Sequence, residues 1–135
     1  MSDNQPFTQH CIYTILHSRK LDEAFNHDGR GEVTENTVWV SGRKMLIDAE
    51  KDGMRVPIIF AGAEADSPKG LLYYAVLRDV LTDEVNQTTT YKFSDLTPIP
   101  DNPPLSILRK RNGGKPLADK YQRPYALCHT PSFIR

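Results

Sequence analysis

The stretch LLYYAVLRDVLTD, Leu71–Asp83, is the longest strand-like run in this chain of 135 residues. Successive side chains of a strand point to opposite faces of a sheet, which places Leu72 and Tyr74 on one face and Leu71 and Tyr73 on the other. Residues 88–93, TTTYKF, alternate in the same way and predict a half-exposed strand close behind it. Strands that follow one another so closely favour antiparallel pairing.

Outward from this stretch, strand-like and helix-like patterns alternate along the chain. Residues 28–36, DGRGEVTEN, are polar and rich in turn formers, so a mobile surface loop is expected there. We interpret the whole as an α+β fold, a small bent mixed sheet or open pseudo-barrel with helices at its ends. The expected elements are strands at 10–18, 37–42, 55–64, 71–83, 88–93 and 125–130, and helices at 19–29, 43–53 and 101–114.

Length and composition indicate one domain, residues 10–135, preceded by a flexible N-terminal tail at residues 1–9. Hydrophobic residues make up 39% and charged residues 25% of the chain, which is typical of a globular protein. The longest apolar runs are much shorter than the roughly 20 residues that cross a bilayer, so no membrane partner is expected. The first residues, MSDNQPFTQH, lack the features of a secretory signal, and a cytoplasmic location is predicted.

Charge is distributed unevenly along the chain, although its formal net charge is zero. From residue 104 onward seven basic residues face one acidic residue, a net charge of +6, and the preceding part carries −6. A basic face that attracts a polyanion is one interpretation, and folding that mixes the charges is the other. The basic residues assigned to a nucleic-acid backbone are Arg109, Lys110, Arg111 and Lys115, within LRKRNGGK.

The cysteines and histidines carry no recognisable site. Cys11 and Cys128 lie near opposite ends of the chain, and we expect two buried thiols, with one disulfide between first and last strands as the alternative. Cys128 and His129 are neighbours and would point to opposite faces of a strand, so they cannot form a catalytic pair there. No two histidines have a metal-ligand spacing, and neither a metal nor a cofactor is predicted.

Two junctions between a strand and a helix combine a hydroxyl group with cations. Ser18 precedes Arg19 after the first strand, and Ser41 precedes Arg43 after the strand that holds Trp39, the only tryptophan. If those strands are neighbours, both junctions open at the same end of the sheet. Hydroxyl groups, guanidinium groups and an aromatic ring are suited to hold a nucleobase and its phosphate. Core packing of Trp39 and helix capping by Ser41 are the alternative roles.

From Val56 onward, the pattern VPIIFAGAE, GLLYYAVLRDVL and TTYKFSDLTPIPDNPPLSIL resembles the PUA-like group that includes the EVE and ASCH domains. The usual EVE opening has a tryptophan in the first strand, where this chain has Tyr13. The resemblance implies a pseudo-barrel that binds RNA, or DNA with a modified base, between the first strand and the strand that follows Gly70. By position, the residues that would line this pocket are His17, Ser18, Arg19, Trp39, Ser41, Arg43 and Tyr74.

We therefore expect a nucleic-acid-binding module that recognises a modified base or nucleotide without turnover. One alternative is a small enzyme acting on nucleotides, with Arg43, Lys44 and either Asp48 or Asp79 as working groups. The enzymatic motifs GxGxxG, GxxxxGK[ST], HExxH and GxSxG are absent from the sequence. The other alternative is a protein-interaction module in which LLYYAVL or the final strand forms an adhesive edge.

Overall fold

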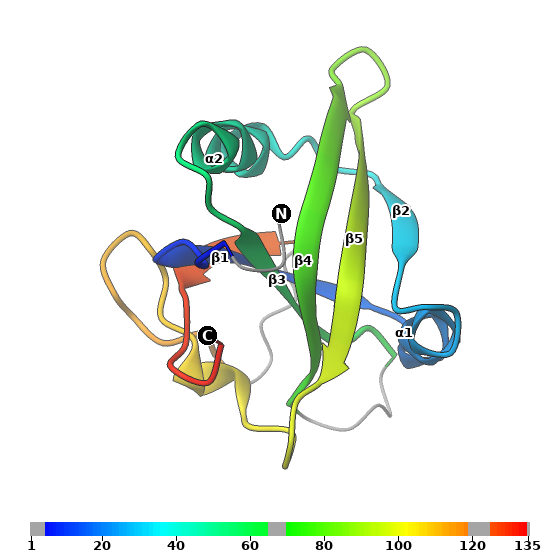
Figure 1. Cartoon of the computed structure of the whole chain (residues 1–135), viewed down its shortest axis with the longest axis vertical. Helices are drawn as coiled ribbons and strands as arrows, with labels where there is room; N and C mark the ends of the chain where they lie inside the picture. Colours follow the sequence, from blue (N-terminus) through cyan, green and yellow to red (C-terminus); the bar gives the residue numbers. More distant parts are fainter. Residues whose placement is uncertain (1–4, 65–69, 119–124, 135) are drawn as a thin grey trace.

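The computed structural model describes residues 5–64, 70–118 and 125–134 (Figure 1). Within this part of the chain, six strands form one open mixed sheet in the order β2-β5-β4-β3-β1-β6. Two helices accompany the sheet, so the α+β class and the bent open sheet are confirmed. The elements are β1 (His10–Leu16), α1 (Ser18–Phe25), β2 (Gly31–Glu35), α2 (Val40–Lys51), β3 (Val56–Gly62), β4 (Leu71–Asp83), β5 (Thr88–Pro98), the 3-10 turn η2 (Leu105–Ile107) and β6 (Tyr125–His129).

β4 is the long central element that the sequence predicts, and it pairs antiparallel with β3 on one side and β5 on the other. β1 is parallel to β3, and the last strand returns antiparallel along β1. α1 follows the carboxyl end of β1, whereas α2 precedes the amino end of β3. Because β1 and β3 are parallel, the two helices lie at opposite ends of the sheet, as Figure 1 shows.

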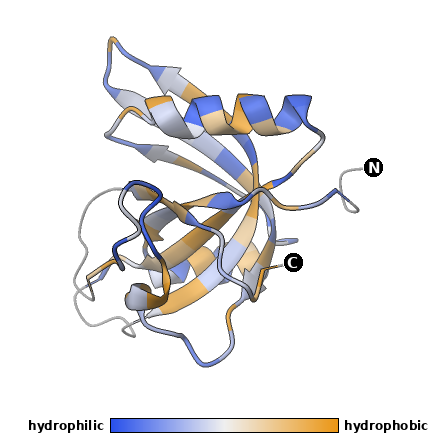
Figure 2. Ribbon diagram, turned by 90° about the vertical axis from the view of Figure 1, so that its left-hand side faces the viewer, coloured by the Kyte–Doolittle hydropathy of each residue, from blue (hydrophilic) through white to orange (hydrophobic). Residues whose placement is uncertain are grey.

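Alternate residues of the strands feed two separate hydrophobic clusters, one on each face of the sheet. Ile12 and Ile58 face the concave side, where both helices pack. Tyr13 and Ile59 face the other side, which apolar residues between 99 and 117, together with Ile134, cover. In Figure 2, apolar and polar residues alternate around α2, as expected for a helix with one buried face.

A stack of three aromatic rings closes the concave side. The Trp39 indole lies 4.7 Å from the Tyr91 ring of β5 and 4.8 Å from the Tyr125 ring of β6, with interplanar angles of 15° and 20°. These strands are separated by β4, β3 and β1 in the sheet, so one side chain reaches both only because the sheet curls. Thr89 fixes the Trp39 backbone, since its hydroxyl oxygen accepts from the Trp39 N–H at 2.8 Å and donates to the Thr37 carbonyl at 2.6 Å.

The second strand is not where the sequence pattern predicts it. Residues 37–42 were expected to form a strand and 28–36 a loop, but β2 occupies Gly31–Glu35 and α2 begins at Val40. The pattern misleads because Trp39 is buried whereas Val40 beside it is 61% exposed at the start of the helix. β2 is a short edge strand whose single apolar side chain, Val33, packs on the core, so it gives little hydrophobic signal.

The helix expected at residues 101–114 is also wrong, because only η2 is helical there. Leu108 has an extended backbone, and a tight hairpin follows in which the Lys110 N–H donates to the Lys115 carbonyl at 2.9 Å. Gly113 and Gly114 have φ of 88° and 69°, the left-handed conformation that such a turn requires. The two glycines therefore mark a hairpin turn, although they also suit the end of a helix.

The residues just before β1 form hydrogen bonds with the chain before β3 and with the chain after β6. Residues 5–9, expected to belong to a flexible tail, include Phe7, whose ring lies 4.0 Å from the Arg55 guanidinium carbon. The Thr8 N–H donates to the Arg55 carbonyl at 2.8 Å, and Thr130 donates its N–H to the Gln9 carbonyl. The sequence ADSPKG, residues 65–70, predicts a turn, but almost all of it lies outside the described residues.

Cys11 and Cys128 are opposite each other in the β1–β6 ladder, and both are buried free thiols. The expectation of two buried thiols is thus confirmed. Burial raises the pKa of the Cys128 thiol to about 11, and burial also raises the pKa of Cys11. Since the thiolate is the reactive form, both groups are protonated and unreactive at neutral pH.

No helix among the described residues combines the length and the apolar character that a membrane crossing requires.

Truncating the indole tests whether the aromatic stack holds the curled sheet. We expect Trp39→Ala to lower the free energy of unfolding by about 3–5 kcal/mol, because it removes a buried ring and leaves a cavity between two strands. Urea unfolding followed by circular dichroism measures the change. The control Val40→Ala alters the next, exposed residue and should stay within about 0.5 kcal/mol of the unmodified protein. A loss below about 1 kcal/mol for Trp39→Ala would contradict this role.

Candidate functional site

The first predicted junction is a polar cluster at the start of α1. Glu64, just beyond the end of β3, accepts hydrogen bonds from the backbone N–H and the hydroxyl group of Ser18. The Glu64 carboxylate also lies 3.1 Å from Nδ1 of His17, whose side chain is 65% exposed. A carboxylate in this position caps the helix and interacts favourably with its positive end. The Ser18 hydroxyl, together with the backbone N–H groups of Ser18 and Glu64, holds the pKa of Glu64 below its ordinary value.

The second predicted junction is at the other end of the sheet. Ser41 and Arg43 lie in the first turn of α2. Arg19 lies in the first turn of α1 and forms an ion pair with Glu23 at 3.3 Å. The expectation that both junctions open at one end is therefore wrong. The two junctions are separated because β2 carries the chain along the length of the sheet before α2 begins.

Two aromatic residues of the predicted pocket are also separated. Trp39 is fully buried within the stack on the concave side and presents no face to a ligand. Tyr74 belongs to the cluster on the opposite face, where its ring lies 6.3 Å from that of Phe133. Hence His17, Ser18 and Arg19 remain together, and so do Ser41 and Arg43, but the seven residues do not line one pocket.

The predicted backbone-binding residues are brought together by a hairpin that we call the basic hairpin, residues 109–116. Arg109 pairs with Pro116 across it, and Lys110 pairs with Cys128 of β6. The Arg111 N–H donates to the Leu127 carbonyl, and the His129 N–H donates to the Arg109 carbonyl, both at 2.8 Å. Four basic side chains thus project from a segment that main-chain hydrogen bonds hold against the edge of the sheet.

A cavity of about 420 Å³ lies between α2 and this edge, and we call it the α2 groove. Ser41, Lys44, Asp48 and Asp52 line one side of it at the three- and four-residue spacing of a single helix face. Arg111 of the basic hairpin and His10 of β1 lie on its other side. Its groups are cationic near the start of α2 and carboxylates near the end of the helix, so the groove is polar along its length.

His10 brings a planar ring to the α2 groove. Its imidazole centroid is 5.0 Å from that of His129, its partner across the β1–β6 ladder. Burial lowers the pKa of His10, and the neighbouring His129 and Arg111 lower it further. At neutral pH His10 is therefore an uncharged ring that can contact a base by its face or accept and donate hydrogen bonds.

Sequence reasoning assigned Ser41 and Arg111 to binding but did not connect them, and it missed His10 as a lining residue. Residues 41, 44, 48 and 52 share a helix face, which a helix starting at Val40 would have indicated. The expected start at residue 43 left Ser41 outside the helix. Pairing of residues 109–111 with β6 has no local sequence signal, because the two segments are not adjacent in the sequence.

No model of a protein family and no curated protein matches the chain. Within the described residues, no group of three or more histidine, cysteine, aspartate or glutamate side chains is arranged to hold a metal ion.

The carboxylate at the start of α1 makes stability depend on pH. Because the pKa of Glu64 is lower in the folded protein than its ordinary value of 4.5, its contribution is present above that value and disappears as the pH falls through the lower, folded pKa. We expect Glu64→Gln to lower Tm at neutral pH and to match the unmodified protein in strong acid. Calorimetry across this range measures the difference. Glu84→Gln, at the β4–β5 turn, is the control, and an effect of Glu64→Gln that is equal at all pH values would refute the electrostatic explanation.

Proposed function

We propose that this protein is a nucleic-acid-binding module of PUA-like fold that holds a base or nucleotide without chemical turnover. The observation that carries the proposal is the basic hairpin beside the cationic end of the α2 groove. The interface differs from the pocket expected from the sequence. It uses Ser41, Lys44 and the basic hairpin, and it excludes Trp39 and the start of α1.

The charge on the hairpin supports contact with a phosphate backbone. Arg109, Lys110, Arg111 and Lys115 lie within seven consecutive residues. No ion pair within residues 5–64, 70–118 and 125–134 involves Arg109, Arg111 or Lys115. Unneutralised cations close together attract a polyanion and release its counterions on binding. Lys120 and Arg123, also counted in the basic region, lie outside the described residues.

The α2 groove supports recognition of a single nucleotide next to that backbone. Ser41, Lys44 and Arg111 supply donors for a phosphate group at one end. Asp48 and Asp52 at the other end accept hydrogen bonds from exocyclic amino groups of a base. A flipped or single-stranded base is read in this way by hydrogen bonds to its edge and by stacking, for which His10 is the available ring.

The sheet supports the PUA-like part of the proposal only in its architecture. A curled mixed sheet has its first and last strands paired, and a helix lies at each end. These features agree with the pseudo-barrel that the sequence pattern predicts.

Neither alternative function receives comparable support. Lys44 and Asp48 line the same groove, but Asp79 is on β4, opposite Lys92 of β5. The run LLYYAVL is paired on both sides, and β6 has its outer edge bonded to residues 109–111, so neither is a free adhesive edge. We therefore propose binding without turnover.

Charge reversal in the basic hairpin tests the proposal. We expect Arg109→Glu combined with Arg111→Glu to weaken binding of a fluorescent single-stranded oligonucleotide at least tenfold at about 0.1 M salt, and to reduce the salt slope by about two. Fluorescence anisotropy at several salt concentrations, on RNA and DNA, measures both quantities.

The control reverses two exposed lysines outside the interface, Lys20→Glu and Lys51→Glu, and so changes net charge equally. It should retain most of the affinity. Absence of binding at low salt, or equal losses in the control and in the hairpin variant, would refute the interface.

A further inference from the structure

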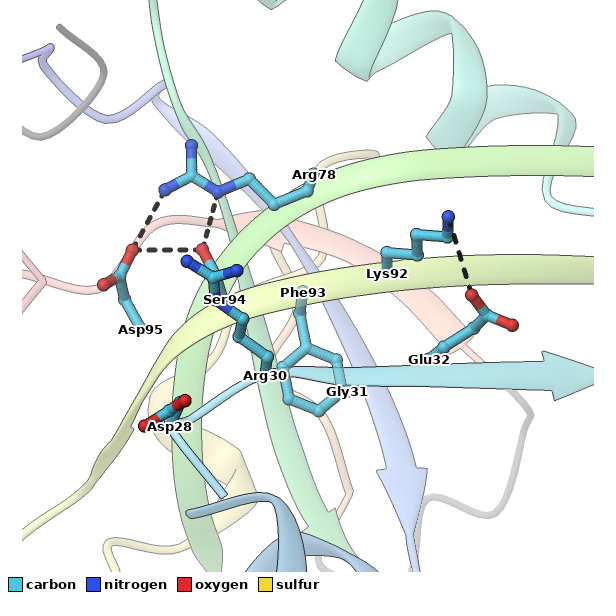
Figure 3. A pocket seen from close by; sticks show the side chains of 9 residues that line it. All are labelled: Asp28, Arg30, Gly31, Glu32, Arg78, Lys92, Phe93, Ser94 and Asp95. Carbon is cyan, nitrogen blue, oxygen red and sulfur yellow. Dashed lines mark hydrogen bonds and ion pairs between the residues drawn. The ribbon is translucent and has the colours of Figure 1, made fainter. Parts of the chain in front are cut away.

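A second and larger cavity, of about 890 Å³, lies on the flank formed by β2, β4 and β5 (Figure 3). None of the residues that line it belongs to the basic hairpin or to the α2 groove. Its lining includes the cations Arg30, Arg78 and Lys92 together with Ser94. Nothing in the proposed nucleic-acid interface uses these side chains.

The backbone departs from regular geometry where it positions the two arginines. The β4–β5 pairing shifts register between Leu77 and Asp79, a bulge that contains Arg78. Asp95 on the facing strand has φ of 58°, which is uncommon for a residue with a side chain. β-Bulges and residues with positive φ occur preferentially next to functional sites, because they redirect particular side chains at some cost in stability.

Arg30 is positioned by close contact between the loop after α1 and β5. The Leu96 N–H donates to the Gly29 carbonyl at 3.1 Å. A Cβ on Gly31 would lie 2.4 Å from the Phe93 ring, so a glycine is required for the chain to pass this close. The loop is thereby pressed onto β5, and Arg30 and Ser94 line the same cavity (Figure 3).

Both arginines retain N–H donors that are not used in hydrogen bonds to other side chains. The Arg78 Nε donates to the Ser94 hydroxyl at 2.6 Å, and Nη2 donates to the Asp95 carboxylate at 3.0 Å, which fixes the plane of the guanidinium group. A guanidinium group has five N–H donors, so most of those on Arg78 remain available. Arg30 forms no hydrogen bond or ion pair with any side chain in the described part of the chain.

We propose that this cavity binds a phosphate ester of a polyhydroxy compound, such as a sugar phosphate, with the phosphate between Arg30 and Arg78. Two guanidinium groups, of which only Arg78 is paired with a carboxylate, match the several oxygens of a phosphate, which they bind in pairs. The cavity is much larger than a phosphate ion. The remaining space leads to Lys92 and Glu32, a pair 3.6 Å apart that can accept from and donate to hydroxyl groups.

Titrations followed by NMR test this site. The probes are inorganic phosphate, ribose 5-phosphate, ribose and succinate, and the signals are the backbone amides of Ser94 and Asp95 and the Nε–H groups of the arginines. We expect saturable shifts with ribose 5-phosphate, weaker binding of phosphate, and none with ribose or succinate. Arg30→Gln should weaken ribose 5-phosphate about tenfold, because it removes a charged hydrogen-bond partner without disturbing a buried contact.

The control Lys51→Gln removes an exposed positive charge on α2 and should leave the affinity unchanged. The inference is overturned if ribose 5-phosphate produces no saturable shift up to about 10 mM, a range that includes weak ligands of millimolar Kd. It is also overturned if Arg30→Gln binds as well as the unmodified protein, or if succinate binds as tightly as ribose 5-phosphate. The site does not depend on the nucleic-acid interface, so either proposal can fail while the other holds.

Discussion

The contact of Trp39 with Tyr91 and Tyr125 is the constraint on which the rest of the architecture depends. An indole between two phenol rings joins strands that are not neighbours in the sheet, and this is possible only when the sheet is curled. Stacked aromatic pairs contribute about 0.5–1.5 kcal/mol each beyond the area they bury, so the contact favours the curled form directly. It also determines where α2 begins, because the next residue, Val40, is the first of the helix.

The same contact positions the candidate interface. Gly42 in the first turn of α2 packs beside Tyr125 of β6, because a Cβ on this glycine would lie 3.7 Å from the Tyr125 ring. β6 in turn holds residues 109–111 at its outer edge. Ser41 and Lys44 of the helix therefore lie across the α2 groove from Arg111 of the hairpin. In the proposed interface, Trp39 acts by holding α2 in place and not by contact with a ligand.

The sequence predicts the parts of this structure that have a strong local pattern. β4 matches its expected range because its thirteen consecutive residues include neither glycine nor proline, and β1, α1, β3 and β5 also follow from local patterns. β2 was missed because an edge strand half exposed to solvent needs few apolar residues. The hairpin at residues 109–116 was mistaken for a helix because prolines before and glycines after an apolar stretch suit either structure, and pairing with β6 decides between them.

The candidate site was harder to predict than the fold. Arg109, Lys110, Arg111 and Lys115 were identified from charge alone, and the structure does bring them together. The two hydroxyl–cation junctions were expected at one end of the sheet, which was wrong. Their relative position depends on the direction of every strand between them, and the missed strand β2 places the second junction at the opposite end. The Arg30 and Arg78 site depends on a bulge and on a glycine below an aromatic ring, and such tertiary features leave no pattern that a single sequence reveals.

The pairing of β1 with β6 bears on how the protein is made. Cys11 and Cys128 are partners in the β1–β6 ladder although 116 residues separate them. The outer edge of β1 therefore stays unpaired until nearly the whole chain has been synthesised. During synthesis on the ribosome, β1 can pair with β3 early, but the Trp39 ring has only Tyr91 as a stacking partner until Tyr125 has emerged. Contacts so distant in sequence slow folding and leave a strand edge unprotected in the meantime. Until β6 has emerged, the outer edge of β1 can therefore pair with a strand of another chain.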